Sequence, residues 1–203
     1  GELIGETTIC DLPVRGTQME AWSLRKSINL SDIVDNNRIG AIEFADGYYF
    51  VSGGVSDGAN QIFVINGKNE LVRQFDQPGD SRYGYRDMAF DGQLLWGIDD
   101  NRVYGFNLDG EIIAQFDSPE GSARAITWDS DNEILWLCSI TSVIFGINRD
   151  GEIVVEIPRP EFGPRIYGLA WYPNDIDDAH LYLYCDMGEE GNQIYKYNLE
   201  TQE

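Results

Sequence analysis

The sequence predicts an all-β protein, a β-propeller built from four-stranded antiparallel blades of about 41 residues each. A mostly apolar motif that ends in Asn recurs along the chain, with its Asn at positions 66, 107 and 148. Each copy lies in a unit of four short strand-like runs separated by turn residues. No window of the sequence has the apolar period of a long helix. A fixed period of this length in strand-like sequence is typical of propellers and solenoids.

The unit that begins near residue 84 shows the predicted order of strands. Apolar runs occupy residues 88–90, 94–98, 103–106 and 112–116, and the turn signal Asp91-Gly92 separates the first two. Successive strands joined by such short turns pair as antiparallel hairpins. The next unit repeats this order with runs at residues 125–128, 134–138, 143–147 and 153–157.

A solenoid of the same period is the main alternative. Leucine-rich and parallel β-helix units are shorter and carry parallel strands, and helical repeats need amphipathic helices. Four-stranded antiparallel units instead pack face to face around an axis, because each sheet is twisted. We therefore expect a propeller. Large aromatic side chains at matching places in the units are expected to be buried between blades: Phe90, Trp96, Trp128, Trp136 and Trp171.

The two ends of the chain carry a second match. Cys10, Gly16 and Leu24 have the same mutual spacing as Cys185, Gly191 and Leu199. This match predicts that the chain enters one blade at its second strand and leaves another after its third. With the chain length it favours a single domain, residues 1–203, of five blades. The expected units are 1–30 (partial), 38–78, 84–119, 123–160 and 165–203 (partial). The strands fall two short of a closed ring of five, so a piece of a larger propeller, a module of a longer chain, is the alternative.

Composition limits the class of partner. The 203 residues include 35 acidic and 14 basic side chains, for a formal net charge of −21. Such a chain would be repelled by the phosphates of nucleic acid, so we expect no nucleic-acid partner. We expect no membrane span, because no apolar run is long enough to cross a bilayer. An acidic surface also keeps a protein soluble, which is the simplest explanation of the charge.

No catalytic motif is present, so we expect no catalytic residues, no metal and no cofactor. His180 is the only histidine, and no local signature identifies a serine nucleophile for it. The segment 129–133 alternates oxygen-bearing side chains as a calcium loop does. It lacks the glycine and distal glutamate of an EF-hand, and a hairpin turn is the favoured interpretation.

Arginines that precede the innermost strands form the one candidate binding site. Arg86, Arg124 and Arg165 each lie just before or at the start of such a strand, and these starts should gather at one mouth of the central channel. One interpretation is structural, in which each arginine pairs with an acid such as Asp87. The other is that the guanidinium groups hold a carboxylate or another anion. The candidate site consists of Arg86, Arg124, Arg165, Tyr85, Tyr167, Asp99, Asp100 and Asp186.

The segments at residues 85–92 and 124–129 are each followed by a Leu-Trp strand, and the sequence Asn-x-Asp-Gly-Glu-Ile comes after the third strand. These three features of the sequence resemble repeats of secreted bacterial β-propellers. This is the broad group related to the NHL, virginiamycin-B-lyase-like and quinoprotein-dehydrogenase-like propellers, and the resemblance covers roughly residues 25–200. It implies an extracellular or cell-envelope location. It also implies a non-catalytic module that presents a loop face to a protein or glycan.

Some members of the group are lyases or lactonases with a metal at the channel. The alternative function is therefore a metal-dependent lyase or hydrolase with a site at the channel mouth, using carboxylates such as Asp99 and Asp186. The histidine and carboxylate–asparagine ligands of those enzymes do not map onto this chain. For this reason enzymatic activity is not the preferred expectation.

Overall fold

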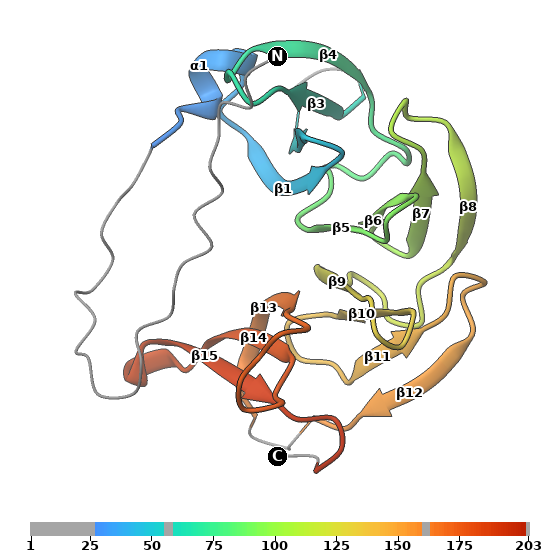
Figure 1. Cartoon of the computed structure of the whole chain (residues 1–203), viewed down its shortest axis with the longest axis vertical. Helices are drawn as coiled ribbons and strands as arrows, with labels where there is room; N and C mark the ends of the chain where they lie inside the picture. The colour runs from blue at the N-terminus through green and yellow to red at the C-terminus, as the bar shows by residue number, and fades with distance from the viewer. Residues whose placement is uncertain (1–26, 55–58, 160–162, 202–203) are drawn as a thin grey trace.

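The computed structural model describes residues 27–54, 59–159 and 163–201, and these residues form four antiparallel sheets that follow one another in an arc (Figure 1). This confirms the all-β prediction and the four-stranded antiparallel blade. In the described part of the chain, the helical elements are α1 (Leu30–Val34) and the short 3-10 turn η1 (Gly188–Glu190). No described helix has the length and apolar character needed to cross a membrane.

Each sheet consists of strands that are consecutive in sequence. The first blade contains β1 (Ile39–Ala45), β2 (Tyr48–Gly53), β3 (Gln61–Ile65) and β4 (Leu71–Asp76). The second contains β5 (Met88–Phe90), β6 (Leu95–Asp99), β7 (Arg102–Phe106) and β8 (Ile112–Asp117). The third contains β9 (Ala125–Asp129), β10 (Ile134–Cys138), β11 (Ile144–Ile147) and β12 (Ile153–Ile157). The fourth contains β13 (Arg165–Trp171), β14 (Leu181–Asp186) and β15 (Asn192–Tyr197).

The described residues form four blades, so the expectation of five is wrong for this part of the chain. The prediction of a fifth blade depended on the repeat match found in residues 1–30. Most of that unit lies outside the described residues, and the helix α1 begins at its last residue, Leu30. The match between Cys10–Leu24 and Cys185–Leu199 lies mostly outside the described residues, because these begin at residue 27.

The innermost strands β1, β5, β9 and β13 contact one another in turn along the inside of the arc (Figure 1). A separate apolar core fills each space between neighbouring blades. Trp96 and Trp136 are fully buried in these cores, as predicted. Phe90, Trp128 and Trp171 are only half-buried at the margins of the cores, which corrects the expectation for these three.

One turn chemistry connects the third and fourth strands in the first three blades. The side-chain oxygens of Asn66, Asn107 and Asn148 each accept hydrogen bonds from backbone N–H groups two and four residues further on. Each Asn amide also donates to a glutamate four residues on, as in the pair Asn107–Glu111 at 2.8 Å. An Asn side chain that imitates a backbone turn fixes where the chain reverses. The 41-residue repeat of Asn is therefore a repeat of one hairpin.

Candidate functional site

Arg86 and Arg124 line one small cavity of about 160 Å³. Arg86 lies in the segment between β4 and β5, and Arg124 directly precedes β9, so the cavity lies where two neighbouring innermost strands begin. We call it the arginine pocket and define it by its lining residues: Ser81, Tyr83, Gly84, Arg86, Ile98, Asp100, Ser122, Ala123 and Arg124.

Backbone hydrogen bonds hold the two sides of the arginine pocket together. Ser122 N–H donates to the carbonyl of Asp100 at 2.8 Å, and Arg124 N–H donates to the carbonyl of Cys138 at 2.9 Å. Asp100 and Ser122 both have positive φ, at 46° and 61°. Few residues other than glycine adopt this conformation, and Asp is one of those that do so most readily. The β6–β7 turn and the loop before β9 are therefore fixed against each other.

The two guanidinium groups of the pocket form no hydrogen bond or ion pair within the described part of the chain. Arg86 lies over the ring of Tyr83, with 5.1 Å between its guanidinium carbon and the ring centroid. Partial burial, followed by the nearby positive charge of Arg124, lowers the pKa of Arg86. The charge of Asp100 acts in the opposite direction and raises the pKa of Arg86, but the lowering causes are larger.

Asp87 does not pair with either arginine. Its carboxylate accepts hydrogen bonds from the backbone N–H of Met88 at 3.1 Å and of Ile126 at 3.0 Å, which links the second blade to the third. Loss of solvent around the carboxyl group raises the pKa of Asp87 to about 7, and the neighbouring charge of Glu43 adds to the effect. The structural interpretation, in which Asp87 neutralises the arginines, therefore does not hold for this acid.

Two further predicted site residues face the interior. Tyr85 is fully buried and stacks on Phe106, with ring centroids 6.1 Å apart. Its hydroxyl donates to the carbonyl of Pro78 at 2.7 Å, and burial raises its pKa. Asp99 is also buried and accepts a hydrogen bond from Asp80 N–H at 2.8 Å. Tyr85 and Asp99 are therefore buried next to lining residues in sequence, but neither lines the arginine pocket.

Arg165 and Asp186 lie together but apart from the arginine pocket. They oppose each other across β13 and β14 and line a separate cavity of about 310 Å³. Asp186 also accepts a hydrogen bond from Gly188 N–H at 2.8 Å. Tyr167 is exposed on the fourth blade and lines neither cavity. The expected cluster of three arginines is thus divided, because Arg165 lines a cavity formed by residues of the fourth blade alone.

Sequence reasoning did not select Ser122 and Ala123 as lining residues. Their residue types do not indicate a binding site. They line the pocket because the backbone turns at Ser122, which has positive φ. Arg86 and Arg124 were recognisable from their positions before the innermost strands. Asp100 was recognisable from its place in the β6–β7 turn.

No group of three or more His, Cys, Asp or Glu side chains in the described ranges has the geometry of a metal site. The ring of His180 packs against Trp171, and its Nδ1 lies 3.0 Å from the carbonyl of Tyr172. In the segment 129–133, Asp129 accepts hydrogen bonds from the N–H groups of Asp131 and Asn132. The segment is thus a hairpin turn closed by its own aspartate.

Comparison with solved structures shows likeness to propellers of the WD40 type. The chain is similar to the WD40 domain of Neurospora crassa Pan2, with a TM-score of 0.60 and 14% sequence identity over 81% of this chain and 48% of that one. It is also similar to a chain of a mitotic checkpoint complex, with a TM-score of 0.56 and 11% identity over 81% of this chain and 49% of that one. The chain therefore spans about half the length of these structures. At this identity the likeness shows the fold alone.

No protein-family model and no curated protein matches the sequence.

Proposed function

We propose that this protein is a non-catalytic interaction module that binds a carboxylate group of a partner protein in the arginine pocket. The observation that carries the proposal is the pair Arg86 and Arg124, which share one cavity without an ion-pair partner among the described residues. In a chain with 35 acidic side chains, two arginines without an ion-pair partner favour an incoming anion. Propellers of the WD40 type commonly mediate protein interactions, and this supports the proposal.

The size of the pocket supports a protein ligand over a glycan. A cavity of about 160 Å³ is smaller than the sites of about 300–1,000 Å³ that usually enclose whole small molecules. It has room for the end of one Asp or Glu side chain, which could bridge the two guanidinium groups. The exposed ring of Tyr83 would lie beside that side chain. The net charge of −21 disfavours a uniformly acidic partner, so the bound carboxylate should belong to a neutral or basic surface.

The test is calorimetric titration with N-acetyl-glutamate methylamide and, in parallel, glucuronate. We expect Arg86→Ala or Arg124→Ala to weaken binding of the glutamate probe roughly 10- to 100-fold, the usual effect of losing a charge-assisted hydrogen bond. Arg165→Ala is the matched control and should bind as the wild type does, because Arg165 lines a different cavity. Unchanged binding in both pocket variants would overturn the proposal. Tighter binding of glucuronate would redirect it to a glycan.

The alternative of a metal-dependent lyase or hydrolase gains no support from Asp99 and Asp186. The two residues lie in different blades, Asp99 at the end of β6 and Asp186 beside Arg165 in the fourth blade.

An extracellular or cell-envelope location remains part of the proposal. It rests on the resemblance of the repeats to those of secreted bacterial propellers, and cell fractionation of the native protein would test it.

A further inference from the structure

A larger cavity of about 670 Å³ lies between the third and fourth blades. We call it the lateral pocket. Its apolar wall is formed by Ile134, Trp136 and Ile157 of the third blade and by Trp171, Tyr197 and Leu199 of the fourth. Its volume is in the range of ligand-binding cavities. It is separate from the arginine pocket and shares no lining residue with it.

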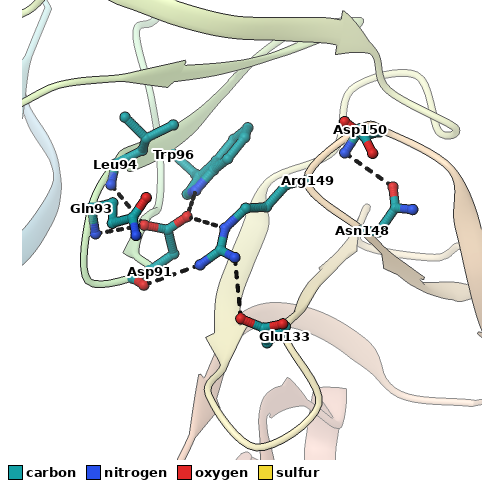
Figure 2. Close-up of polar contacts among 8 residues, drawn as sticks. All are labelled: Asp91, Gln93, Leu94, Trp96, Glu133, Asn148, Arg149 and Asp150. Atoms are coloured by element: carbon teal, nitrogen blue, oxygen red, sulfur yellow. Dashed lines mark hydrogen bonds and ion pairs between the residues drawn. The ribbon is translucent and has the colours of Figure 1, made fainter.

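The neighbouring space, between the second and third blades, holds an arginine side chain (Figure 2). Arg149 Nε donates to the buried carboxylate of Asp91 at 2.7 Å, and its Nη1 lies 3.3 Å from Glu133. The guanidinium carbon lies 4.5 Å from the centroid of the Trp128 ring. Asp91 also accepts a hydrogen bond from Trp96 Nε1 at 3.0 Å. The space between the second and third blades is thus filled by a guanidinium group that stacks on a tryptophan and pairs with acids.

Leu199 occupies the position equivalent to Arg149, as Leu108 does in the second blade and Gly67 in the first. Asn148 and Asn198 begin equivalent turns, and each side-chain oxygen accepts a hydrogen bond from the N–H two residues on. Trp171 corresponds to Trp128, because each packs near the end of the innermost strand against the core shared with the preceding blade. Leu199 is shorter than arginine and uncharged. Leu199 packs at the margin of the core between the third and fourth blades, and the lateral pocket lies beside it.

The lateral pocket keeps the acidic character that suits a guanidinium. It is lined by Asp131, Glu156, Asp178 and Glu200 and by no described Lys or Arg. None of these four acids forms an ion pair with a described residue. The indole Nε1 of Trp171 is buried and has no hydrogen-bond partner in the described structure. A buried donor without a partner is costly, so an indole that turned toward the pocket to meet a ligand's acceptor would lose that cost.

We propose that the lateral pocket receives an arginine side chain from a partner protein. The guanidinium lies against Trp171, as Arg149 lies against Trp128, and the surrounding carboxylates neutralise its charge. When the Trp171 indole turns toward the pocket, a backbone carbonyl of the same partner accepts the hydrogen bond of its Nε1, which favours a peptide over a free organic cation. The site is independent of the proposed function, because Arg86 and Arg124 take no part in it.

The test uses N-acetyl-arginine methylamide as the probe. Its binding is measured by calorimetry and by the change in the NMR signals of the tryptophan indole N–H groups. We expect the corresponding citrulline compound, which has the same shape without the charge, to bind at least tenfold more weakly. Agmatine, which has the guanidinium but no carbonyl, should also bind more weakly. Arg124→Ala should leave the affinity unchanged, which separates this site from the arginine pocket.

Two variants locate the binding in the lateral pocket. Leu199→Arg supplies an internal guanidinium and should reduce probe affinity at least tenfold while the protein keeps its thermal stability. Trp171→Phe removes the indole N–H and should weaken the arginine probe several-fold while affecting agmatine less. Equal binding of the citrulline compound, full binding by Leu199→Arg, or no saturable binding at millimolar probe would overturn the proposal. Agmatine as tight as the arginine probe would overturn the assignment to a protein partner.

Discussion

At the scale of single residues, the role of a charged side chain in this protein depends on which backbone groups lie within hydrogen-bonding distance of it. Asp87 and Arg86 are neighbours in sequence, yet the Asp87 carboxylate faces N–H groups of two blades and Arg86 faces the arginine pocket. Position before an innermost strand identified the arginines from sequence. The sequence did not reveal the partner of Asp87, because Ile126 lies 39 residues away and the contact depends on how two blades meet.

We predict that Asp87 makes the stability of the protein depend on pH near neutrality. Its folded pKa of about 7 lies above the ordinary value for Asp, so the folded state holds the proton more tightly than the unfolded chain. The contribution of Asp87 is therefore fully present below about pH 4 and is lost as pH rises through about 7. Urea unfolding of the wild type and of Asp87→Asn should be compared at pH 5 and pH 8. The wild type should gain more stability on acidification than the variant, and parallel curves would contradict the prediction.

At the scale of elements, tryptophan–glycine pairs shape the middle of two blades. Trp96 on β6 opposes Gly105 on β7, and Trp136 on β10 opposes Gly146 on β11. A Cβ atom at Gly105 would lie 2.7 Å from the Trp96 ring. The indole therefore lies flat across a strand where any side chain would displace it. The sequence showed a glycine inside each of these strands, but only the register shows which ring covers it.

We predict that Gly105→Ala destabilises the protein by about 1–3 kcal/mol, because the added methyl group overpacks a fully buried ring. Gly67→Ala is the matched control. A Cβ there meets no atom within 4 Å, so this variant should be neutral or slightly stabilising. Chemical denaturation of the two variants beside the wild type measures the difference. Similar stability of both variants would show that Trp96 moves aside without cost.

At the scale of the whole molecule, the described residues form four blades, and the full chain carries a formal net charge of −21. The repeat predicted the strands, their antiparallel order and the packing of the innermost strands, because each depends on local turns and on a period. The number of blades was not predictable in the same way. It depended on reading residues 1–30 as strands, and of that segment the structure describes only residues 27–30, just before and at the start of α1. The separation of Arg165 from Arg86 and Arg124 was not predictable either, because a repeat shows which positions are equivalent but not how far apart they lie.

We predict that sodium chloride stabilises this protein. At pH 7 the formal charge of −21 makes the folded chain repel itself, and salt screens such repulsion over distances of about 10 Å at 0.1 M. The midpoint of thermal unfolding should rise by several degrees between 10 and 300 mM salt at pH 7. Near pH 4, where many carboxylates are protonated, the same addition should have little effect. A fall in the midpoint at pH 7 would show that the ion pairs outweigh the general repulsion.

The order of strands within each sheet has a consequence for how the chain folds. Every hydrogen-bonded neighbour in the four sheets is also a neighbour in sequence, so each hairpin closes a short loop. Loops of this kind form in microseconds, and a single blade can gather its strands before the rest of the chain is ordered. The slow event is then the docking of one blade on the next, when the cores around Trp96 and Trp136 lose water.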